Sequence, residues 1–188
     1  QDLKSFFLNY HTLYKKIFND GQKILYTGDL LYSLREVGLV INNSNEWFSN
    51  FRITEFEGLF IVTDKFTLPS IDRVFPLSRD ESIFLAKKIN VNSEDITLDI
   101  GTGSAVLALQ MAKIAKHTIA IDINKKALSY GYFNACLNGL SDKIEFILSD
   151  IFDNIKGAKF SKIISNPAVI PVPNNSSFFI HSDGGILG

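Results

Sequence analysis

The residue types that could bind a charged ligand gather near the middle of the chain, at Asp99, Gly101, Thr102 and Gly103. An apolar run precedes them and a helical pattern, residues 104–116, follows at once, so we predict a strand, a tight turn and a helix start. Such a turn should offer free backbone N–H groups to a ligand. Asp99 would repel a pyrophosphate and attract a cation. The turn therefore favours S-adenosylmethionine (SAM), which carries an ammonium and a sulfonium, over a dinucleotide.

Two further acids stand at or just after the ends of later apolar runs. Asp122 ends the second run, nineteen positions after Gly103, where it could accept hydrogen bonds from both ribose hydroxyls of SAM. Asp150 follows the third run and could accept from the adenine amino group, with Ile151 and Phe152 packing on the ring. The alternatives are an ordinary glycine turn at 101–103, a helix cap at Asp122 and a solvated loop acid at Asp150.

The elements that must position these residues alternate along the second half of the chain. The predicted strands are 96–100, 118–122, 144–148 and 161–165, and the predicted helices are 79–89, 104–116 and 125–137. This alternation predicts an α/β fold with a doubly wound, Rossmann-like parallel sheet. The fourth strand would lie at an open edge of the sheet. We expect a partner chain, or a C-terminal segment outside this sequence, to cover it.

The first part of the chain has a different pattern. We predict an N-terminal domain at residues 1–68 and the SAM-binding core at residues 69–188. The N-terminal domain should hold helices at 3–18 and 30–37, a polar turn at 42–45 and a hairpin of 51–56 with 59–63 around Glu57 and Gly58. Such a small α+β unit resembles a winged-helix module that recognises the substrate. We favour a cap on the core, because the second helix carries no Lys/Arg cluster.

Composition excludes several classes of function. The net charge of -1 gives no basic surplus, so nucleic acid is a less favoured partner. The single cysteine, Cys136, allows no disulfide framework and indicates a reducing, cytoplasmic environment. No apolar run is long enough to span a membrane, and no spacing of His, Cys or acids indicates a metal site.

A fourth stretch, Asn166-Pro167-Ala168-Val169, follows the last strand. The four stretches together resemble the class I SAM-dependent methyltransferases. More closely, they resemble the methyltransferase small domain group, which includes release-factor glutamine methyltransferases and amino methyltransferases of nucleic acids. The resemblance covers about residues 74–188. A second, weaker resemblance involves Asp72-Arg73-Val74-Phe75-Pro76, which is similar to a segment that closes over SAM in related enzymes.

The resemblance implies that Asn166 and Pro167 are catalytic, with the Asn166 side chain and the Pro167 carbonyl accepting hydrogen bonds from a planar NH₂ group. The group carries Asn-Pro-Pro-aromatic, whereas this chain has Ala168 and Val169. Phe178 or Phe179 could supply the missing ring, although core packing is the favoured interpretation of both. The predicted cofactor-binding residues are Asp99, Gly101, Thr102, Gly103, Asp122, Ile123, Asp150, Ile151 and Asn166.

The resulting hypothesis is a SAM-dependent methyltransferase that acts on a nitrogen of a protein, nucleic acid or small molecule, with S-adenosylhomocysteine (SAH) as product. One alternative is a small-molecule N- or O-methyltransferase of a biosynthetic pathway. The other is a non-catalytic, SAM-binding subunit that relies on another chain.

Overall fold

The structure, a computed structural model, describes residue 5 and residues 24–25, 29–36, 38–44, 46–77, 81–173, 176 and 178–187. The predicted helix at 3–18 therefore lies outside the described residues except at Ser5. So does the start of the predicted helix at 79–89, because residues 79–80 are not among those described.

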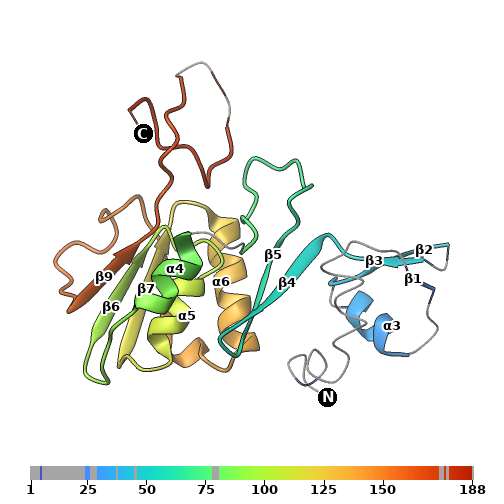
Figure 1. Cartoon of the computed structure of the whole chain (residues 1–188), viewed down its shortest axis with the longest axis horizontal. Helices are drawn as coiled ribbons and strands as arrows, with labels where there is room; N and C mark the ends of the chain where they lie inside the picture. The colour runs from blue at the N-terminus through green and yellow to red at the C-terminus, as the bar shows by residue number, and fades with distance from the viewer. Residues whose placement is uncertain are drawn as a thin grey trace.

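The second half of the chain forms a parallel sheet of four strands (Figure 1). The strands are β6 (Ile96–Ile100), β7 (His117–Asp122), β8 (Ile144–Leu148) and β9 (Lys162–Ser165). Their order is β8-β7-β6-β9, so the chain first builds outward from β6 and then returns to its other side. This reversal is the doubly wound topology, and it confirms the predicted α/β fold. β9 lies at one edge among the described residues.

Three helices pack on one face of this sheet (Figure 1). They are α4 (Glu81–Lys88), α5 (Val106–Ala112) and α6 (Lys125–Leu137), and a short turn of 3₁₀-helix, η2 (Ser141–Lys143), follows α6. Small residues at the interface, such as Ala108, Ala120 and Ala135, let the helices approach the strands closely. On the other face, Leu98 and Ile121 pack with residues of the loop that follows β8.

The N-terminal part contains one helix and five short strands among the described residues. They are β1 (Ile24–Leu25), α3 (Asp29–Glu36), β2 (Ile41–Asn43), β3 (Glu46–Phe48), β4 (Phe51–Phe56) and β5 (Leu59–Asp64). The predicted hairpin is confirmed, with Phe56 opposite Leu59. The predicted turn at 42–45 is wrong at its start, because Asn42 and Asn43 pair with β3 as strand residues.

β5 is buried on both of its faces. Leu59 and Ile61 join the core formed by the helices and the parallel sheet. Phe60 and Val62 point the other way, into a second cluster that contains Trp47 and is also lined by residues of α6. β5 and α6 therefore belong to both clusters, and the predicted boundary at residue 68 stays a prediction.

Candidate functional site

The predicted site residues lie at one edge of the parallel sheet, where its strands end. Ile100 of β6 pairs with Ile121 of β7 and with Ser165 of β9. Asp122 pairs with Leu148, the last residue of β8. Because parallel strands end side by side, the loops that carry the predicted residues all leave from this edge. The topology thus brings together the stretches that the sequence singled out.

Asp99 is a buried carboxylate on the face of β6 that the helices cover, with 1% of its surface exposed. Its Oδ2 accepts hydrogen bonds from Thr102 Oγ1 at 2.7 Å and from the Ala108 backbone N–H at 3.0 Å. No described residue donates a hydrogen bond to its Oδ1. Burial raises the pKa of Asp99 to about 6, because removal from water disfavours the charged form. A cation next to the unpaired Oδ1 would therefore stabilise the charged form of Asp99.

Most backbone N–H groups of the glycine-rich loop already donate hydrogen bonds within the protein. The N–H groups of Gly101 and Thr102 both donate to the carbonyl of Ile121. The N–H of Gly103 donates to Asp122 Oδ2 at 2.8 Å. The expectation of free N–H groups is therefore wrong at these three positions. Adjacent strand β7 supplies the acceptors, which hold the loop against the sheet edge.

The loop backbone alternates through the left-handed region. Gly101, Gly103 and Ala105 have φ values of 70°, 54° and 65°. A Cβ at Gly101 or Gly103 would meet nothing within 4 Å, so both positions face open space in the described structure. Ala105 is strained in this conformation, which alanine rarely adopts. The turn continues to this residue, so α5 begins at Val106 and not at the predicted 104.

Asp122 holds two backbone groups. Its Oδ2 accepts from Gly103, and its Oδ1 accepts from the N–H of Asn124 at 2.8 Å. Burial raises the pKa of Asp122 above its ordinary value, and the backbone hydrogen bonds oppose that shift. Asn124 caps α6, because its Oδ1 accepts from the N–H of Lys126. The carboxylate thus fixes the glycine-rich loop to the start of α6.

The loop after β8 presents exposed side chains at the same edge. Ile151 has a φ of 43°, an unusual conformation for a β-branched residue, and its side chain is 55% exposed. Ser149 stabilises this turn, since its Oγ donates to the carbonyl of Ile151 and accepts from the N–H of Asn154. Asp150 and Ile123 are also exposed. The strained turn keeps Ile151 in the open.

Asn166 lies at the end of β9 with its side-chain orientation fixed. Its Nδ2 donates to Ser82 Oγ of α4 at 2.8 Å. Oδ1 is then the atom of the carboxamide that remains as an acceptor. The next residues of this loop are open, since Val169 is 65% exposed.

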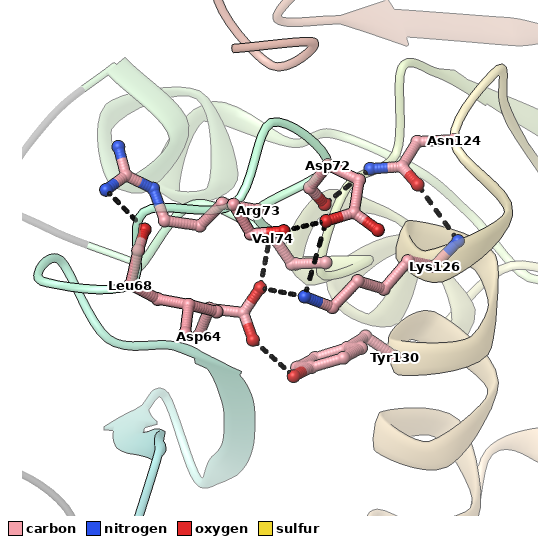
Figure 2. Close-up of polar contacts among 9 residues, drawn as sticks. Asp64, Leu68, Asp72, Arg73, Val74, Asn124, Lys126 and Tyr130 are labelled. Atoms are coloured by element: carbon pink, nitrogen blue, oxygen red, sulfur yellow. Dashed lines mark hydrogen bonds and ion pairs between the residues drawn. The ribbon is translucent and has the colours of Figure 1, made fainter.

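A polar cluster fastens the segment between β5 and α4 to α6 (Figure 2). The buried carboxylate of Asp64 lies 2.8 Å from Lys126 Nζ, accepts from the Val74 N–H at 2.8 Å and accepts from the Tyr130 hydroxyl. Asn124 Nδ2 donates to the carbonyl of Asp72 at 2.9 Å. Segment 65–77 therefore runs over the start of α6, beside Asp122.

The C-terminal segment packs against this same stretch. His181 stacks between Phe75 and Phe179, with ring centroids 4.7 and 5.4 Å away. The guanidinium of Arg73 lies 4.3 Å from the centroid of the Phe179 ring. Burial and the charge of Arg73 lower the pKa of His181. Phe179 thus packs in an aromatic cluster between two loops, and neither it nor Phe178 is part of the described core clusters.

Within the described residues, no helix is both long and apolar enough to cross a membrane. The same residues contain no group of three or more His, Cys, Asp or Glu side chains placed to hold a metal ion.

A comparison with known protein families matches the part of the chain that contains the parallel sheet and the proposed site. Residues 78–176, more than half of the chain, match the methyltransferase small domain. This chain belongs to that family.

Several curated and solved proteins are similar to this methyltransferase small domain chain. The release factor glutamine methyltransferase of Agrobacterium fabrum is 31% identical over 125 residues, which cover 62% of this chain and 40% of that protein. The ribosomal protein uL3 glutamine methyltransferase of Francisella tularensis is 35% identical over 81 residues, covering 41% and 26%. The crystal structure of a tRNA m1G37 methyltransferase from Methanocaldococcus jannaschii is 26% identical with a TM-score of 0.48, covering 65% and 36%. The chain spans less than half the length of each of these proteins.

Two observations show that SAM is compatible with this edge of the sheet. The buried, orphaned Oδ1 of Asp99 matches the ammonium of SAM. The open space at Gly101 and Gly103 would be filled by any side chain and is free for a ligand. The side chains at this edge are carboxylates, which accept hydrogen bonds and attract a cation, and exposed aliphatic groups. Both suit a cation that is attached to a ribose and an adenine.

Sequence reasoning missed the residues that position this edge from outside the motifs. Ser82 orients Asn166, and Asp64 anchors the overlying segment. Asn134 of α6 is fully buried and was not singled out. One signal could have found it: residues 127, 131 and 135 place a small-residue face on this helix, and residue 134 falls on the same face.

Proposed function

We propose that this chain is the cofactor-binding part of a SAM-dependent methyltransferase that methylates the side-chain amide nitrogen of glutamine in a protein. The observation that carries the proposal is the placement of Asp99, Asp122 and Asn166 at one edge of the sheet, within a family of methyltransferases. The choice of a glutamine amide rests on the names of the relatives. The net charge of -1 also favours a protein over a nucleic acid.

Asp99 would bind the ammonium of SAM, and Asp122 the ribose hydroxyls. Asp122 already accepts two backbone hydrogen bonds, and its carboxylate has further lone pairs for this purpose. Ile123 and Ile151 would pack against the adenine, with Asp150 accepting from its amino group. Thr102 keeps Asp99 oriented and contributes through that carboxylate.

When bound, SAM supplies an electrophilic methyl group on sulfur, whose leaving group is neutral SAH. The protein therefore has to align a nitrogen with that methyl at about 3 Å. The Oδ1 of Asn166 and the carbonyl of Pro167 would accept the two N–H bonds of the substrate NH₂ and turn its lone pair toward the methyl. As the N–C bond forms and the C–S bond breaks, these dipoles stabilise the positive charge on nitrogen. The amide nitrogen then loses one proton to water.

The hydrogen bond from Asn166 to Ser82 gives this step its orientation. Because Ser82 Oγ occupies the Nδ2 side, the Oδ1 side is the one presented to a substrate N–H. Exposed Val169 leaves the neighbouring space open for an extended peptide that carries the glutamine.

The test combines SAH calorimetry with methyl transfer from tritiated SAM into fractionated lysate. We expect the wild-type chain to bind SAH and to label protein. Asn166→Ala should keep SAH binding and lower labelling at least about a hundredfold, because it removes the positioning acceptor. Asn50→Ala, at an exposed turn between β3 and β4, is the matched control and should label normally.

The other outcomes decide among the alternatives. Label that appears only in small molecules would replace the protein substrate with a small-molecule acceptor. SAH binding without transfer to any fraction would support a non-catalytic subunit. Absence of SAH binding would overturn the cofactor assignment itself. The cytoplasm stays the predicted compartment.

A further inference from the structure

Asn134 is a fully buried carboxamide on α6 that makes three hydrogen bonds. Its Oδ1 accepts from the Val62 N–H at 2.8 Å, and its Nδ2 donates to the Val62 carbonyl at 3.0 Å. The second hydrogen of Nδ2 is donated to the carbonyl of Ser104, also at 3.0 Å. One side chain therefore joins the N-terminal hairpin to the glycine-rich loop of the proposed cofactor site.

Asn138, one turn further along α6, repeats only the first half of this arrangement. It pairs with the N–H and carbonyl of Phe60 at 2.9 and 2.8 Å. Four residues of helix rise about 6 Å, and two residues of strand rise about 6.7 Å. The two asparagines thus match the spacing of Phe60 and Val62 and act as a neighbouring strand for β5. The remaining N–H of Asn138 returns to its own helix, at the carbonyl of Asn134.

A second contact places α6 against the same loop. A Cβ added at Gly131 would lie 3.1 Å from the Ala105 Cβ and 2.6 Å from Phe146. The helix therefore contacts two successive loop residues. Asn134 bonds to Ser104, and Gly131 packs against Ala105. Ala105 is the non-glycine residue of this loop with a left-handed φ, so the loop is strained where the helix supports it.

We propose that Asn134 is a positioning residue for the cofactor: by holding the Ser104 carbonyl, it keeps the glycine-rich loop in its binding conformation and couples that loop to the β4–β5 hairpin. The inference rests on the proposed function, because it assigns the loop a SAM-binding role. It gives the hairpin a part in cofactor binding besides any role in covering the core.

The pair of asparagines supplies its own control. Asn134→Leu and Asn138→Leu each remove one carboxamide from the edge of β5 at nearly constant volume. Only the first also removes the hydrogen bond to Ser104. In the full 188-residue chain, we expect both variants to lower the melting temperature, Asn134→Leu by more because Asn134 is fully buried. We expect Asn134→Leu to weaken SAH binding at least tenfold by calorimetry, and Asn138→Leu less than twofold.

Hydrogen exchange of the peptide that spans residues 101–108 gives a second readout without ligand. It should exchange faster in Asn134→Leu and at the wild-type rate in Asn138→Leu. Equal SAH affinity and equal exchange in the two variants would overturn the inference. If Asn134→Leu does not fold, the Asn134→Ser and Asn138→Ser pair makes the same comparison. A wild-type chain that binds no SAH overturns the proposed function instead, and exchange alone then decides the role of Asn134.

Discussion

Single residues at the sheet edge carry a cost in stability. Asp99 shows this most clearly, because its carboxylate is buried with one oxygen unsatisfied. A buried charge without a full set of partners destabilises the folded chain. A ligand cation would remove that penalty, so part of the binding free energy is stored in the free protein.

The first prediction is that Asp99→Asn weakens SAH binding at least tenfold without lowering the stability of the free chain at pH 7. The amide can still accept from Thr102 and Ala108, but it cannot attract an ammonium. Calorimetry and urea unfolding measure the two effects. A variant that binds SAH like the wild type would remove Asp99 from the site.

The same carboxylate fixes a pH dependence. Its pKa is raised from 3.8 unfolded to about 6 folded, so the folded state binds the proton more tightly. Stability from this group is present below about pH 4 and is lost as pH rises through 6, by about 3 kcal/mol. SAH affinity should change in the opposite direction and fall below pH 6. Asp99→Asn should reduce both dependences, and what remains reports on Asp122, whose pKa burial also raises.

A second residue-scale prediction compares two glycines with nearly the same backbone. Gly101 and Gly58 have φ values of 70° and 74°, and a Cβ at either would meet nothing within 4 Å. Alanine at each should therefore cost a similar amount, about 1 kcal/mol. Only Gly101→Ala should also weaken SAH binding, because its new methyl enters the proposed site. Similar SAH affinities in the two folded variants would contradict that placement.

At the scale of elements, α6 anchors segment 65–77 at the start of the helix. Lys126 is the cationic partner of buried Asp64 and also lies 3.7 Å from Asp72 (Figure 2). The helix cap Asn124 adds a hydrogen bond to the same segment. The start of one helix thus fixes both Asp122 and the segment above it.

The third prediction is that Lys126→Met destabilises the chain by about 1–3 kcal/mol, because Asp64 keeps a buried charge without its cation. Lys125→Met is the matched control, since Lys125 is exposed, and should change the unfolding free energy by less than about 0.5 kcal/mol. Urea unfolding measures both. In a double-mutant cycle, adding Asp64→Asn to Lys126→Met should cost less than Asp64→Asn costs in the wild type. Strictly additive changes in unfolding free energy would show that the ion pair is not the cause.

At the scale of the whole molecule, two hydrophobic clusters share β5 and α6. Ile61 packs into the cluster of the parallel sheet, and Phe60 into the cluster around Trp47. If β5 or α6 unfolded, both clusters would lose part of their buried surface. We therefore expect the N-terminal part and the parallel-sheet core to unfold together.

The fourth prediction follows from that shared core. Trp47 is the single tryptophan of the chain and is 1% exposed, so its fluorescence reports on the N-terminal cluster. Far-ultraviolet circular dichroism reports mainly on the helices of the core. The two urea transitions should coincide. A fluorescence transition at lower urea would instead mark the predicted boundary at residue 68 as the border of an independently folding unit.

The sequence by itself determined the strands and the edge at which the site lies. Strands β6 and β8 and helix α6 have the predicted bounds, because apolar periodicity and chain breakers act locally. Once these elements alternate, parallel pairing places Asp99, Asp122 and Asn166 at one edge without any knowledge of distances.

Only the tertiary structure decided what each polar group contacts. The N–H groups of the glycine-rich loop bond to β7, and Asn166 bonds to Ser82, eighty-four positions earlier. Asn134 joins Val62, seventy-two positions earlier, to Ser104, thirty positions earlier. Such hydrogen bonds depend on distances of a few tenths of an ångström between segments that the fold brings together. Residue types and spacing carry no such information, and so these partners follow from the packing alone.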